Sequence, residues 1–139
     1  MWALSGTSPV TLRTAEHVIA IDHARLLVEV RLAGFFNPLQ AAHATDEVRA
    51  AIRTLGDRVG QHVTLYDASG IDVAPAATVE LLKGAYADPA IRHLWARRVA
   101  YVSPSALMRI QLKRLRAARA DIGIFAEREA ALDYLLGER

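Results

Sequence analysis

The apolar residues of this chain follow two different spacings in turn, and the alternation predicts strands separated by helices. Five short runs are rich in β-branched residues or alternate apolar with polar positions, as strands do. They span residues 17–22, 25–32, 63–66, 98–102 and 122–125. Elsewhere, apolar residues recur every three or four positions, as on one face of a helix. Such helices are expected at 38–59, 75–88, 103–118 and 127–136.

The order of these elements is β-β-α-β-α-β-α-β-α. A short link at 22–24 joins the first two strands into an antiparallel hairpin, and each later strand follows a helix, which favours parallel pairing. We therefore predict a single α/β domain at 15–139, with a mixed, mostly parallel sheet of four to five strands and an antiparallel edge hairpin strand. Residues 1–14 are expected to form a mobile N-terminal lead. Because unpaired edge strands tend to be covered, a homodimer through the hairpin edge or the N-terminal lead is a further expectation.

The most informative stretch runs from His62 to Tyr86, where a buried strand is followed by turn residues and a helix. Asp67 and Gly70 favour a turn after the strand, and Pro75 suits the first turn of a helix. In open α/β sheets, ligands bind outside the carboxyl ends of the strands. This loop is therefore where we expect a ligand or partner site. Its candidate residues are Asp67, Ser69, Asp72 and Thr78.

The positive charge of the chain is concentrated in one segment. Residues 89–120 contain eight of the seventeen Lys and Arg residues and no acid, whereas the rest contains nine basic and fifteen acidic residues. Three of the eight share one face of a predicted helix, which suits a small anionic ligand or an acidic partner. The alternative is a solvated face that pairs with acids of the same domain. The candidate anion-facing residues are Arg98, Arg109, Lys113 and Arg116.

Composition and motifs argue against several classes of protein. There is no cysteine, which excludes disulfides and fits a cytoplasmic location. No apolar run reaches the ~18 residues of a membrane span, and no signal peptide is recognisable. The five histidines lack metal-motif spacing, Ser69 does not lie in a G-x-S-x-G elbow, and aromatic residues do not interleave with the basic ones. We therefore expect no metal, no cofactor, no nucleic acid and no enzymatic activity.

The element order and several short motifs resemble those of STAS domains (sulfate transporter and anti-sigma-factor antagonist), above all small stand-alone SpoIIAA-like proteins. The resemblance covers residues 18–136. It rests on D-A-S-G-I at 67–71, G-F-F at 34–36, R-R-V-A-Y-V at 97–102, I-F-A at 124–126 and E-A-A-L-D-Y-L at 129–135. It implies a SpoIIAA-like fold and a non-enzymatic module that binds a protein partner or a small anionic ligand.

The chain departs from the family at the family's switch. Antagonists of anti-sigma factors carry a second D-S-[SA]-G motif at the start of the following helix, and its first Ser is phosphorylated. Alignment on 67–70 places P-A-A-T there, and Ala76 has no hydroxyl. The resemblance therefore implies a member without the serine phospho-switch. Ser69 and Thr78 are the nearest hydroxyls, and because a helix N-terminus favours phosphate, phosphorylation of Thr78 is a hypothesis.

Two other functions compete with this interpretation. One is a carrier of a lipid or another apolar small molecule, which an internal apolar cavity of about 300 Å³ or more would favour, whereas a filled core would favour the partner-binding module. The other is an enzyme that uses Asp67 and Asp72, since paired carboxylates bind Mg²⁺. No third ligand or phosphate-binding loop accompanies these two residues. An aspartate at the end of a strand more often bonds its own backbone.

Overall fold

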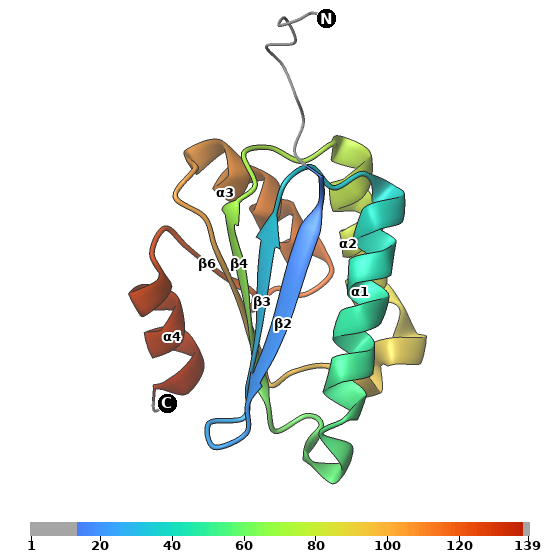
Figure 1. Cartoon of the computed structure of the whole chain (residues 1–139), viewed down its shortest axis with the longest axis vertical. Coiled ribbons are helices and arrows are strands. Elements are labelled where there is room, and N and C mark those ends of the chain that lie inside the picture. Colours follow the sequence, from blue (N-terminus) through green and yellow to red (C-terminus); the bar gives the residue numbers. More distant parts are fainter. Residues whose placement is uncertain (1–13, 138–139) are drawn as a thin grey trace, which may run out of the picture.

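A five-stranded sheet organises the computed structural model, which describes residues 14–137 (Figure 1). The strands are β2 (Glu16–Asp22), β3 (Leu27–Ala33), β4 (Val63–Gly70), β5 (Arg98–Val102) and β6 (Gly123–Phe125), and they lie side by side in that order. β2 pairs with β3 in the antiparallel sense, and the other neighbours are parallel. This confirms the predicted mixed sheet and hairpin. The predicted mobile lead falls almost wholly outside the described residues.

Helices cover both faces of the sheet. The α-helices are α1 (Pro38–Arg53), α2 (Ala76–Ala87), α3 (Ala106–Lys113) and α4 (Arg128–Leu136), and the 3₁₀ helices are η1 (Gly56–Arg58), η2 (Pro89–Leu94) and η3 (Arg114–Ala117). Figure 1 shows α4 on one side of the sheet and α1 and α2 on the other. α3 lies on the side of α2, because Met108 and Leu112 belong to the same core cluster as Val79. Strand residues point alternately to the two faces. Leu65 accordingly packs in the core under α4, whereas its neighbour Tyr66 packs on the opposite side.

Local start signals set two helix boundaries. The Asn37 side chain accepts a hydrogen bond from the Gln40 N–H, and the Gln40 side chain accepts one from the Asn37 N–H, so α1 begins in a capping box. For α3 the expected start at Ser103 is wrong by two residues. Ser105 is the N-cap, and its hydroxyl oxygen accepts from the Met108 N–H at 3.1 Å.

The predicted turn at Asp67–Gly70 is also wrong, because β4 continues through these residues. Asp67 pairs with Arg31, and Gly70 pairs with Ala33. Between these two pairs β4 has one residue more than β3, so β4 contains a bulge. Gly70 lets the strands approach here, since a Cβ atom at that position would lie 2.7 Å from the Ala33 Cβ atom. The loop before α2 therefore begins only at residue 71.

Two predicted helices end earlier than their apolar spacing indicates. α1 ends at Arg53 with Thr54 as its C-cap, and the chain continues through η1. α3 ends at Lys113 and tightens into η3. A 3₁₀ helix has three residues per turn rather than the 3.6 of an α-helix, so the positions that face the core change. The buried positions Leu55 and Leu115 thus stay in the core although they lie outside the α-helices.

Candidate functional site

The predicted loop residues Asp67, Ser69 and Asp72 lie at the carboxyl end of β4 or just beyond it. The Asp67 carboxylate accepts a hydrogen bond from the Ser69 N–H at 3.0 Å, a side-chain-to-backbone bond within the bulge of β4. Ser69 and Asp72 are exposed. The structure thus gives Asp67 a backbone-bonding role and leaves two polar side chains open to solvent.

Thr78 is not part of this exposed loop. It lies in the first turn of α2, its side chain is buried with 2% of the residue exposed, and its hydroxyl donates to the Phe36 carbonyl oxygen at 2.8 Å. The placement of Thr78 among accessible site residues is therefore wrong. A phosphate on this hydroxyl would have to displace the chain segment that leads into α1.

The loop is held between two helices. Gln111 of α3 bonds both backbone polar groups of Ala74: its carbonyl oxygen accepts from the Ala74 N–H at 3.1 Å, and its amide donates to the Ala74 oxygen at 2.6 Å. On the other side, the bond from Thr78 to Phe36 ties α2 to the start of α1. These contacts place the β4–α2 loop next to the second turn of α3 and next to the segment that leads into α1.

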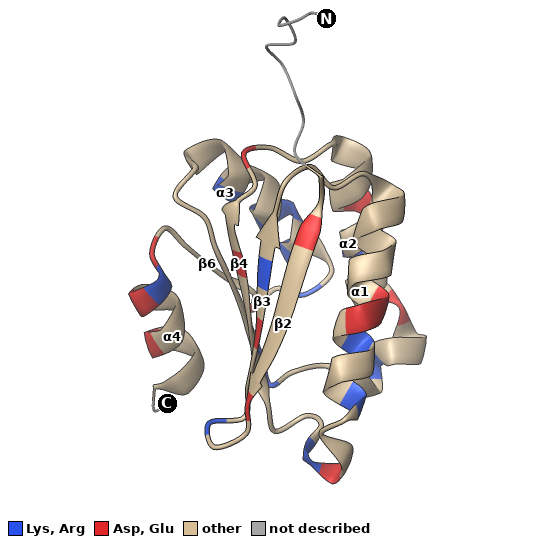
Figure 2. Ribbon diagram, viewed as in Figure 1, with Lys and Arg blue, Asp and Glu red and all other residues tan. Residues whose placement is uncertain are grey.

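Large apolar side chains are exposed around this loop. Leu39 opens α1 and is 78% exposed, Val73 lies in the loop and is 45% exposed, and Leu107 and Ile110 of α3 are 56% and 61% exposed. Figure 2 shows few charged residues at this end of the molecule, where α1 and α2 begin. We name these four residues, together with Ser69 and Asp72, the loop surface. Sequence reasoning found its polar members but missed the apolar ones.

The four basic candidates do not form one surface. Arg98 begins β5, stacks over the Tyr134 ring at 5.4 Å and donates to the Tyr134 carbonyl oxygen, which places it under α4. Arg109 instead donates to the Ser103 oxygen at 2.9 Å, beyond the far end of the same strand. A five-residue strand is roughly 16 Å long, so these two guanidiniums are well separated.

The other two basic candidates lie on α3 and η3. The Arg116 Nε donates to the Ile122 carbonyl oxygen at 2.9 Å, and Lys113 is exposed. Three of the four predicted anion-facing side chains therefore bond backbone carbonyls of their own domain. Helical spacing alone does not show which basic side chains already bond within the domain, and an anion-facing role for the four residues stays a prediction.

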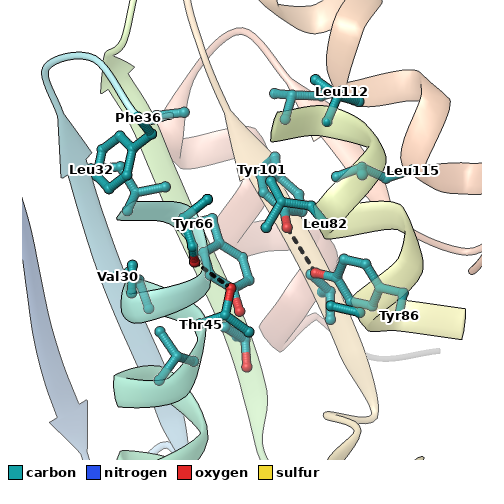
Figure 3. Close-up of a pocket in the computed structure, with 18 of the residues that line it drawn as sticks. Val30, Leu32, Phe36, Thr45, Tyr66, Leu82, Tyr86, Tyr101, Leu112 and Leu115 are labelled. Carbon is teal, nitrogen blue, oxygen red and sulfur yellow. Dashed lines mark hydrogen bonds between the residues drawn. The ribbon is translucent and has the colours of Figure 1, made fainter. Parts of the chain in front are cut away.

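The structure shows a site that sequence reasoning missed, a cavity of about 140 Å³ between the sheet and helices α1 and α2 (Figure 3). Tyr66 and Tyr101 stack on its floor with ring centroids 4.7 Å apart, and the hydroxyls of Tyr101 and Tyr86 lie 2.8 Å apart. Most of the remaining lining is aliphatic. The volume is less than half of the 300 Å³ set for a lipid carrier, so the cavity does not support a long-chain ligand.

Burial controls the electrostatics of this cavity. It raises the pKa of Tyr66, Tyr86 and Tyr101 well above the ordinary value of 10, and the nearby positive charge of Arg119 offsets only part of that effect. All three phenols therefore remain neutral at physiological pH. They are available as hydrogen-bond donors and acceptors, not as bases.

Two other kinds of site are absent from residues 14–137. No group of three or more His, Asp or Glu side chains is placed to hold a metal ion in this part of the chain. Within the same range, no helix has the length and hydropathy needed to cross a membrane.

The comparisons with known proteins address the fold. No family model matches the chain, and a search of curated protein sequences finds no match. Among solved structures, the chain is similar to the anti-sigma factor antagonist SpoIIAA in its unphosphorylated form. The TM-score is 0.54, the identity is 21%, and the match covers 89% of this chain and 99% of that chain. The chain has the SpoIIAA fold. This confirms the predicted SpoIIAA-like architecture, and at this identity the likeness concerns the fold alone.

Proposed function

We propose that the chain is a non-enzymatic binding module that docks a protein partner through the loop surface. The observation that carries this proposal is the grouping of exposed apolar side chains. Among residues 14–137, five large apolar residues are exposed, and four of them belong to the β4–α2 loop (Val73) or to the helices next to it, α1 (Leu39) and α3 (Leu107 and Ile110). Exposed apolar groups that gather in this way mark interaction surfaces, because each gains from removal of water on binding.

The loop surface is already ordered for docking. Gln111 of α3 holds the backbone N–H and carbonyl oxygen of Ala74 by hydrogen bonds. The Thr78 hydroxyl holds the first turn of α2 against the Phe36 carbonyl, just before α1. A partner that binds a held loop does not have to order it, so less of the interaction free energy is lost on association. The predicted partner surface is mainly apolar, because Asp72 is the one acidic residue of the loop surface.

The SpoIIAA fold supports a protein as the partner. The similar solved structure is that of an anti-sigma factor antagonist, and we extend from it only the expectation that this chain also acts on another protein. A cytoplasmic location and a homodimer through the β2 edge remain predictions. Light scattering of the purified chain tests the second.

In our proposal the chain works without a phospho-switch at the start of α2. Ala76 and Ala77 have no hydroxyl, and Thr78 directs its hydroxyl to the Phe36 carbonyl in the protein interior. Binding is then regulated by the amount of partner or of chain, not by a charge added to this helix. Phosphosite mapping of the chain from its own cells tests this, since a modified Thr78 would contradict it.

Quantitative co-purification tests the docking surface. Tagged chain is recovered from the cells that make it, and the co-purifying proteins are quantified for wild type, Val73→Asp and Ile110→Asp. Val18→Asp is the matched control, because Val18 is equally apolar and exposed but lies on β2, away from the loop surface. The proposal predicts one protein that is depleted at least tenfold by both loop-surface variants and kept by the control. Equal recovery in all four samples would contradict it, provided that urea unfolding shows all four to be folded.

A further inference from the structure

A buried arginine lines the tyrosine cavity and has a donor group without a partner. Arg119 is only 6% exposed; its Nε donates to the Asp121 carboxylate at 2.9 Å and its Nη2 to the Ala96 carbonyl oxygen at 2.7 Å. Its Nη1 has no hydrogen-bond partner among the described residues. An unpaired donor on a buried charged group is costly, which makes an acceptor in the cavity favourable.

A second unpaired donor lies beside the first. The Trp95 ring, which also lines the cavity, packs against the Arg119 guanidinium with 4.5 Å between the ring centroid and the guanidinium carbon. The Trp95 Nε1 is buried and likewise has no partner within residues 14–137. Indole nitrogen is a donor only, as is guanidinium. The two unpaired groups therefore call for a ligand with two acceptor atoms close together.

The charge of the cavity lining also favours a ligand that accepts hydrogen bonds. The carboxylate that bonds Arg119 belongs to Asp121, whose side chain is largely exposed, so solvent screens its negative charge and it offsets only part of the positive charge of the guanidinium. Arg49 of α1 adds a second cation to the cavity lining. The ligand group with two adjacent acceptors and one negative charge is a carboxylate, which matches guanidinium geometry.

The remaining lining sets the body of the ligand. It is built from aliphatic and aromatic side chains such as Val30, Leu112 and Leu115 (Figure 3). A cavity of about 140 Å³ is close in size to an engineered cavity of about 150 Å³ that binds benzene. The space thus suits one aromatic ring or a short branched chain and is too small for a fatty acid.

We propose that the cavity between the sheet, α1 and α2 binds a small monocarboxylic acid with an aromatic or branched aliphatic body, whose carboxylate accepts hydrogen bonds from Arg119 Nη1 and Trp95 Nε1. A surface hollow between α1 and α2 shares the lining residues Thr45, Arg49 and Ala85 with the cavity, and the proposal takes this hollow as the route in. None of the six residues of the loop surface lines this cavity. A failed test of one proposal therefore leaves the other unaffected.

Benzoate is the probe that tests this site. We expect saturable binding in a titration followed by ¹H–¹⁵N NMR, with contacts from the benzoate ring to the Leu115 methyl groups. Arg119→Lys should weaken binding about ten- to hundredfold, the effect of losing a hydrogen bond to a charged group. Arg53→Lys is the matched control, because Arg53 is exposed at the end of α1, and it should leave the affinity unchanged.

A second variant keeps the test decisive if Arg119→Lys does not fold. Ala44→Leu places a larger side chain at a lining position and should abolish benzoate binding while the chain stays folded. Benzyl alcohol, which lacks the charge, should bind at least tenfold more weakly than benzoate, and laurate should not enter the cavity. Absence of saturable benzoate binding, equal affinity for benzyl alcohol, or full affinity in Ala44→Leu would each overturn the proposal.

Discussion

Acidification should destabilise this protein well above the pH at which its carboxylates titrate, because of one buried histidine. His62 leads into β4 and is fully buried. Its Nδ1 accepts a hydrogen bond from the Gly60 N–H at 3.1 Å, and its Nε2 has no partner within residues 14–137. Burial, with a smaller contribution from the charge of Arg119, lowers the pKa of His62 from 6.5 to about 4. The imidazole is therefore neutral in the folded protein over most of the physiological range.

The sign and size of the effect follow from that shift. Between pH 6.5 and 4 the unfolded chain binds a proton at His62 that the folded chain does not, so the free energy of unfolding falls as pH falls. For pKa values of 6.5 unfolded and about 4 folded, the loss is about 2 kcal/mol at pH 5 and about 3 kcal/mol at pH 4. The stabilisation is complete above pH 6.5.

Urea unfolding at pH 8, 6, 5 and 4 and constant ionic strength measures this loss. His62→Asn is the matched variant, because an amide oxygen can accept from the Gly60 N–H but does not titrate. The hydrogen bond between Glu47 and His17 lowers the pKa of Glu47, and its contribution below about pH 4.5 is common to both proteins. The wild type should lose about 2 kcal/mol more than the variant between pH 8 and 5. Parallel curves, or an NMR titration of His62 near pH 6.5, would refute the reasoning.

Two further predictions concern packing. Gly70→Ala should destabilise the fold by about 2 kcal/mol or more, because the added Cβ atom would lie 2.7 Å from the Ala33 Cβ atom. Gly84→Ala is the control: no atom lies within 4 Å of the added Cβ atom, and the substitution should stabilise the fold by about 0.5–1 kcal/mol. Thermal or urea unfolding compares the pair, and equal losses would show that strand approach is not the cause. Tyr86→Phe and Tyr101→Phe should each lower the free energy of unfolding by about 1 kcal/mol, since each hydroxyl is the other's hydrogen-bond partner. In a double-mutant cycle the interaction energy between the two positions should be about 1 kcal/mol. Strict additivity would contradict the hydrogen bond.

Elements of this fold were predictable where the signal is local. The capping box at Asn37 and the alternation of apolar and polar residues along β3 need only a few neighbouring positions. The end of β4 was not predictable in this way. Its last residues pair with β3, and the close approach of Gly70 to Ala33 depends on a strand about forty residues earlier in the chain.

The sites illustrate the same limit. The sequence gives no sign of a partner for the Thr78 hydroxyl, which in the structure donates to a carbonyl oxygen 42 residues earlier in the chain. The tyrosine cavity joins three aromatic residues from β4, α2 and β5, and its charged end adds Trp95 and Arg119. No periodic or motif signal connects these positions. Only the packing of α1 and α2 on the sheet brings them to one place.

Photo-crosslinking in cells tests the central claim most directly. A photoreactive phenylalanine analogue is placed at Leu107 or Ile110 on the loop surface, and at Arg53 as the exposed control on α1. We predict a crosslinked product between the chain and a different protein from both loop-surface positions and none from position 53. A product of twice the chain's mass, or the same products from all three positions, would contradict a protein partner docked at the loop surface.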